Sequence, residues 1–115
     1  MKPSKELVAA SATPIVLSVL ADGDSYGYEL LQKIRDRSNG QLDWKEGMMY
    51  PLLHRLEQGG LISGYDGIGP TGRRRRYYRI TPKGRRSLTQ HRDHIHSIAA
   101  VLGLLPSPAT GAQGV

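Results

Sequence analysis

Four consecutive arginines at 73–76 are the side chains of this sequence best suited to bind another molecule. A guanidinium group donates paired hydrogen bonds to a phosphate, so a cluster of arginines is typical of a surface that binds a polyanion. The cluster lies in a segment, 67–92, with nine basic residues and no acidic one. The rest of the 115-residue chain has seven basic and ten acidic residues, so the net charge of +6 arises in this segment. A solvated basic loop is the alternative interpretation.

Other chemistry has less support in the sequence. The absence of cysteine excludes a disulfide framework, a thiol nucleophile and a thiolate metal site. There is no glycine-rich phosphate loop opening a helix, no pair of carboxylates in a polar setting and no convincing Ser-His-Asp set, so we do not expect an enzyme. His91 and His94 have a spacing that permits joint metal binding on a helix, but we favour a polar stripe with one interfacial histidine. We therefore expect neither a metal nor a cofactor.

Two helices are expected in the first 40 residues. The first covers 7–20, and Pro14 either restarts or kinks it. Ser25 would cap the second helix, which Gly40 helps to end because glycine tolerates a left-handed backbone. A short extended piece is expected at 42–44.

A third helix is predicted to have two different faces. Apolar residues recur every three or four positions until Gly59 and Gly60, which predicts a buried face made of Met49, Leu52, Leu53 and Leu56. The opposite face would enter the major groove of DNA, where its polar side chains reach phosphates or base edges. The ring of Pro51 would crowd the carbonyl of Gly47, and the missing Cβ of Gly47 would give the backbone room. This opposite face consists of Gly47, Tyr50, Pro51, His54 and Gln58, with Arg55 at its flank.

A β-hairpin with a basic tip follows the third helix. Strands are expected at 61–65 and 75–80, joined by a glycine-rich loop at 66–72. Because side chains alternate along a strand, Tyr78 would face the core. The arginines at 73–76 would lie at or near the tip, where they would contact the phosphate backbone or the minor groove and supply salt-dependent affinity.

A long helix is expected over 82–105, with Thr81 as its N-cap and Pro82 at its first position. One side has residues spaced alternately three and four apart, as in the seam of a coiled coil. Either the first helix of the same chain or a second copy must cover this stripe. We favour a homodimer, because two-fold symmetry would present two recognition helices to a palindromic operator. The stripe consists of Leu88, His91, Ile95, Ile98, Leu102 and Leu105.

These elements predict a mainly α fold with a small β-hairpin wing (α+β), a winged helix-turn-helix with a C-terminal dimerisation helix. The DNA-binding domain would span 1–81, the dimerisation helix 82–105 and a disordered tail 106–115. No apolar run approaches the roughly 20 residues that cross a bilayer. The N-terminus lacks the pattern of a signal peptide, so we expect a cytoplasmic protein that has no membrane partner.

Short motifs agree in order and spacing with a known family: SYGYEL at 25–30, EGMMYPLL and RLE within 46–57, GLI at 60–62 and RRYYRIT at 75–81. In these motifs the sequence resembles the PadR family of bacterial transcriptional regulators. The resemblance implies a homodimeric winged-helix repressor whose C-terminal helices form much of the dimer interface. It also implies release from DNA by a small aromatic or drug-like effector. Met48 replaces a small or hydroxylated residue of the family, and Trp44, the only tryptophan, precedes the third helix.

The hypothesis is therefore a sequence-specific DNA-binding transcriptional regulator, a homodimeric repressor that a small-molecule ligand releases. The alternative is an RNA-binding or protein-interaction winged-helix module without an inducer. The partner expected for the repressor is double-stranded DNA with a palindromic operator. The residues expected to contact this DNA are Tyr26, Lys45, Gly47, Met48, Tyr50, Pro51, His54, Arg55, Arg73, Arg74, Arg75 and Arg76.

Overall fold

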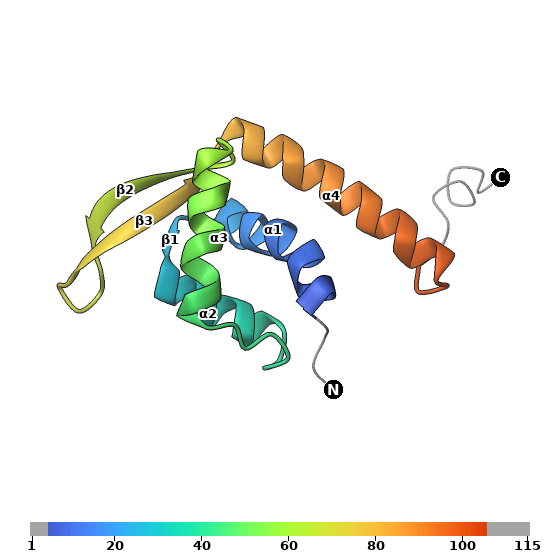
Figure 1. Ribbon diagram of the computed structural model, residues 1–115, viewed down its shortest axis with the longest axis horizontal. Helices are drawn as coiled ribbons and strands as arrows, with labels where there is room; N and C mark the ends of the chain where they lie inside the picture. The colour runs from blue at the N-terminus through green and yellow to red at the C-terminus, as the bar shows by residue number, and fades with distance from the viewer. Residues whose placement is uncertain (1–4, 106–115) are drawn as a thin grey trace.

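The computed structural model describes the backbone of residues 5–105 and the side chains of residues 11–105, so the tail expected at 106–115 lies outside it. The elements are α1 (Lys5–Asp22), β1 (Ser25–Tyr26), α2 (Gly27–Arg37), α3 (Glu46–Gln58), β2 (Ile62–Ile68), β3 (Arg74–Ile80) and α4 (Pro82–Val101). The three strands of the described chain form one antiparallel sheet in the order β1-β3-β2. Four helices accompany this sheet, which confirms the predicted α+β winged helix-turn-helix fold, with β2 and β3 as the wing (Figure 1).

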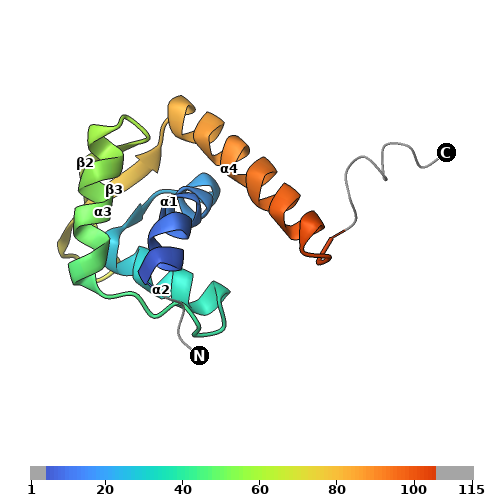
Figure 2. The ribbon, with the colours of Figure 1, turned by 45° about the vertical axis from the view of Figure 1, so that its right-hand side comes forward.

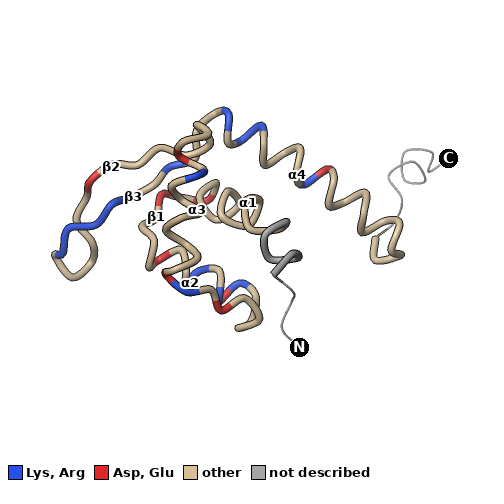
Figure 3. Tube along the Cα trace, viewed as in Figure 1, with Lys and Arg blue, Asp and Glu red and all other residues tan. Residues whose placement is uncertain are grey.

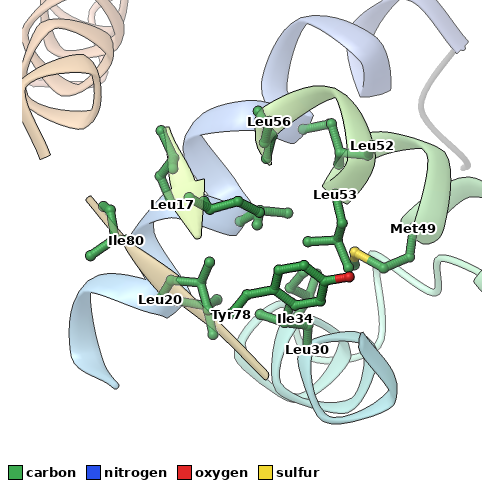
Figure 4. Packing of buried hydrophobic residues seen from close by; sticks show 14 of the residues in the cluster. Leu17, Leu20, Leu30, Ile34, Met49, Leu52, Leu53, Leu56, Tyr78 and Ile80 are labelled. Carbon is green, nitrogen blue, oxygen red and sulfur yellow. The ribbon is translucent and has the colours of Figure 1, made fainter. Parts of the chain in front are cut away.

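One hydrophobic core joins α1, α2 and α3 to the sheet (Figure 4). The apolar face predicted for α3 is confirmed, since all four of its residues are buried. Each aliphatic side chain that leaves water contributes about 1.5–3 kcal/mol, so this face holds α3 firmly and leaves its opposite face outward. The residues that Figure 4 labels in this core are Leu17, Leu20, Leu30, Ile34, Met49, Leu52, Leu53, Leu56, Tyr78 and Ile80.

The last helix, α4, begins on the core and then leaves it. Thr81 caps the helix as predicted, because its hydroxyl accepts a hydrogen bond from the N–H of Gly84 at 3.0 Å. Gly84 lies directly against the carbonyl oxygen of Leu61, and Leu88 is buried. Beyond Leu88 no residue of α4 is buried within the described chain, and the end of the helix extends past α1 in both Figure 1 and Figure 2.

The short strand β1 lies before α2 and was not predicted, whereas residues 42–44, expected to form a small strand, do not belong to the sheet. Ser25 pairs with Tyr78 of β3 and is buried. Its hydroxyl oxygen accepts a hydrogen bond from the Lys33 ammonium at 2.7 Å, so Ser25 does not cap α2 as predicted. The N-cap residue is Tyr26, whose side chain forms no cap hydrogen bond.

Of the two alternatives expected at Pro14, the restart does not occur, because α1 is continuous through this residue. Two predicted element ends differ from the structure. The wing is longer than predicted, because residues 66–68 of the expected loop pair with β3. Strand β2 therefore reaches Ile68 and leaves 69–73 for the turn. Helix α4 ends at Val101, four residues early, and Gly103 follows with a φ of +80°. A positive φ stops a helix whatever the apolar pattern beyond it.

Candidate nucleic-acid interface

The exposed face of α3 contains the residues predicted to enter the major groove. The helix is continuous through Pro51, and an added Cβ at Gly47 would meet no atom within 4 Å. Space for a side chain is therefore not the reason for glycine at position 47. Met48 is half-buried and packs against the core, whereas Lys45 is exposed and its ammonium lies 3.0 Å from the Asp43 carboxylate. The exposed residues of the predicted face are Gly47, Tyr50, Pro51, His54, Arg55 and Gln58.

The side chain of Tyr50 connects α3 to the start of α2. Its ring lies across Gly27, where an added Cβ would come within 2.8 Å of the ring carbon Cε1. Because Gly27 has no side chain, the Tyr50 ring can pack against the backbone there, and 46% of the surface of Tyr50 stays exposed. The phenol thus lies beside the first turn of α2, where unpaired backbone N–H groups favour an anion such as a phosphate.

The wing brings the four arginines at 73–76 into three different environments. Arg73 and Arg74 are exposed at the tip, and neither forms an ion pair with another residue of the described chain. The guanidinium of Arg75 lies 5.0 Å from the centre of the Tyr26 ring, on the outer face of the sheet. Arg76 lies on the other face of the hairpin. Figure 3 shows how basic residues follow β3 to the tip of the wing.

A row of aromatic and basic side chains covers the outer face of the sheet. The ring centres of Tyr77 and Tyr26 are 5.4 Å apart, and the two rings are arranged edge to face. The ring of Tyr77 also stacks on that of Tyr65, with 5.7 Å between the ring centres. The Arg79 guanidinium lies 4.6 Å from the centre of the Tyr65 ring. The Tyr65 hydroxyl donates a hydrogen bond to Asp24 at 2.6 Å, which raises the pKa of Tyr65. Because each aromatic pair contributes about 0.5–1.5 kcal/mol, the row stiffens the base of the wing.

Arg76 binds α3 across the inner face of the wing. Its Nη2 donates a hydrogen bond to Oε2 of Glu57 at 2.8 Å, and the same oxygen accepts the N–H of Gly64 at 3.1 Å. The bond to Glu57 raises the pKa of the Arg76 guanidinium. Glu57 and Tyr65 were not among the residues predicted from the sequence. The alternation of β3 could place Arg76 on one face, but no local signal identifies a partner on another element.

The stripe predicted for dimerisation divides into two parts. Leu88 is buried in the core of its own chain, and His91 is half-buried. Leu102 and Leu105 lie beyond the end of α4. The exposed fractions of the remaining apolar residues are 48% for Ile95, 44% for Ile98, 67% for Leu102 and 40% for Leu105.

Other kinds of site have little support in the described residues. No three His, Asp or Glu side chains among them are grouped to hold a metal ion. No helix in this part of the chain has the length and apolar character to cross a membrane. A hollow of about 200 Å³ lies between α1 and α2 and is lined by Ile15, Ser18, Val19, Ile34, Arg37, Ser38 and Leu42.

A family model described as the transcriptional regulator PadR-like family matches residues 16–90. The chain belongs to this PadR-like family. The match includes α2, α3, the wing and the start of α4, which are the elements that carry the candidate interface. It confirms the resemblance found in the short motifs. The family is one of transcriptional regulators and not a class of enzymes.

Relatives of this PadR-like chain are similar over most of its length. The transcriptional regulator Rv3488 of Mycobacterium tuberculosis is 36% identical over 100 residues, which cover 86% of this chain and 90% of that protein. The structure of a transcriptional regulator from Clostridium thermocellum has a TM-score of 0.77 and 34% identity, covering 90% of this chain and 100% of that one. A PadR-like transcriptional regulator from Bacillus cereus has a TM-score of 0.76 and 27% identity, covering 86% and 94%.

Proposed function

We propose that this PadR-like regulator is a sequence-specific DNA-binding repressor that acts as a homodimer. The observation that carries the proposal is the presence of two surfaces on one domain: the exposed face of α3 and the basic wing. The recognition helix of a winged helix-turn-helix lies in the major groove. Tyr50, His54 and Arg55 would contact base edges or phosphates there, while Arg73 and Arg74 would contact the backbone beside it.

The exposed apolar half of α4 supports the homodimer. Ile95 and Ile98 leave the core of their own chain and expose nearly half of their surfaces. A second copy that packs the same stripe against them would bury this surface around a two-fold axis. The same axis would present two α3 helices to DNA, so the operator would be a palindrome with half-sites about one turn, roughly 34–36 Å, apart.

The proposed effector is a small aromatic or drug-like molecule that releases the repressor from DNA. The hollow between α1 and α2, about 200 Å³, is smaller than the roughly 300–1,000 Å³ of pockets that hold drug-sized ligands. We propose the interface between the two α4 helices as the effector site, because the exposed apolar side chains of Ile95 and Ile98 would line it. A ligand there would change the distance between the two recognition helices and so weaken operator binding.

Selection of bound sequences from random duplex DNA tests the proposal. We expect palindromic sites with a fixed half-site spacing, and a gel shift that is lost when one half-site is scrambled. Equal binding to all duplexes, or preference for single-stranded RNA, would contradict the repressor and favour the alternative module. Transcription in vitro from a promoter that overlaps the selected site should then fall as protein is added; a rise would indicate an activator.

A further inference from the structure

The inner face of the wing contains a site that holds one arginine. The Arg76 guanidinium binds the Glu57 carboxylate at 2.8 Å and lies 4.0 Å from that of Asp66. It also lies 5.8 Å from the centre of the Tyr78 ring. Below it is Gly64, where an added Cβ would come within 2.6 Å of Nη2. The Glu57 carboxylate, the Tyr78 ring and the space left by Gly64 all lie around one guanidinium, so this site is specific for Arg76.

The neighbouring arginines lack such a site. Arg73 and Arg74 form no ion pair with the described residues, so their charges are available to a polyanion, whereas the Arg76 side chain, although 48% exposed, is paired with Glu57. Glu57 belongs to α3 and is 33% exposed, which places the carboxylate partly out of water and strengthens its attraction for Arg76. The same carboxylate accepts the Gly64 N–H, so Glu57 ties β2 and β3 of the wing to α3 at once.

We propose that Glu57 is a specificity-determining residue that withholds Arg76 from DNA and fixes the wing relative to α3. The inference rests on the proposed DNA-binding function. A free arginine on the wing adds a phosphate contact that any sequence can supply. A wing held at one angle to the recognition helix can engage only together with α3 in its correct position. Withholding the arginine lowers the affinity for every duplex alike, whereas holding the wing at one angle lowers the affinity for random DNA more than the affinity for the operator.

The test compares Glu57→Gln with wild type by titrating a labelled operator and a labelled random duplex over a range of salt concentrations. Glutamine keeps an acceptor for the Gly64 N–H but removes the charge that binds Arg76. One new phosphate contact makes the slope of log affinity against log salt steeper by about 0.9 per protomer. When salt falls about fourfold, the variant should therefore gain about 3.5-fold more affinity per protomer than wild type gains, for any duplex. Release of the wing from its fixed angle to α3 should in addition lower the ratio of operator to random affinity.

Two controls separate the site from a general effect of charge. Asp66→Asn removes a charge from the same wing, but Asp66 is 94% exposed and lies further from the guanidinium, so its effect on the slope should be smaller. In an Arg76→Gln background, Glu57→Gln should no longer steepen the slope. An unchanged slope in Glu57→Gln, or an equal gain in the Arg76→Gln background, overturns the proposal.

Gly64→Ala provides a test that leaves the net charge unchanged. Its Cβ would displace the end of the Arg76 side chain, and Gly64 does not have a positive φ that alanine would strain. If Glu57→Gln does not fold, Gly64→Ala tests the proposal alone. A slope of log affinity against log salt equal to that of wild type then contradicts the proposal. Failure of the wild-type protein to bind any duplex would instead refute the proposed function, so the two failures are distinguishable.

Discussion

Replacement of both Arg73 and Arg74 by glutamine tests whether the tip of the wing binds phosphates. The two side chains are exposed and form no ion pair with other described residues, so their charges can be removed without breaking a contact of the fold. Glutamine retains part of the aliphatic stem and a polar end. We expect weaker binding to operator and random duplex alike, because phosphate contacts contain little sequence information.

The size of the effect follows from the number of charges lost. Each phosphate contact contributes about 0.9 to the slope of log affinity against log salt, so two arginines on each of two protomers contribute about 3.6. When salt rises from about 50 to 200 mM, the wild-type dimer should therefore lose about 150-fold more affinity than the variant does. A monomer would show about half of this slope change, so the same measurement reports on the stoichiometry.

Fluorescence anisotropy of labelled duplexes at several salt concentrations measures this slope. The matched control is a double variant, Arg85→Gln with Arg86→Gln, which removes the same charge from exposed positions at the start of α4. Its slope should change much less than that of the wing variant. If the wing variant keeps the wild-type slope, or if the slope falls equally in the two variants, the wing does not bind phosphates in the way its exposed arginines indicate.

Three further predictions concern the interface between copies, the core and the sheet. Ile98→Asp with Leu102→Asp should give a monomer by analytical ultracentrifugation, because the exposed stripe would have to bury charge; a persistent dimer would place the interface elsewhere. Gly84→Ala should lower the free energy of unfolding by about 1–3 kcal/mol in urea titrations, since its Cβ would press against a backbone carbonyl, and unchanged stability would contradict the packing of α4. The bond to Asp24 raises the pKa of Tyr65, so its stabilisation is lost as pH rises through that pKa. Tyr65→Phe should therefore lose less stability than wild type above about pH 10, and identical alkaline curves would argue against the bond.

Features that depend on near neighbours in the chain could be predicted from the sequence. The buried face of α3 follows from a 3.6-residue period, and the start of α4 follows from Thr81 and Pro82. The strand β1 could not be predicted, because two residues have no period and its hydrogen bonds depend on β3. The end of α4 was predicted too late because the apolar stripe continues past Val101, whereas the left-handed backbone at Gly103 stops the helix.

The run of arginines illustrates the limit most clearly. Arg75 and Arg76 are chemically identical neighbours, and the alternation of a strand predicts only that they face opposite ways. Their roles differ because Tyr26, from β1, lies on one face and Glu57, from α3, lies on the other. Neither partner is near the arginines in sequence. A count of basic residues therefore overestimates the charge that this wing offers to DNA, and the sheet register together with the position of α3 determines how much of it remains available.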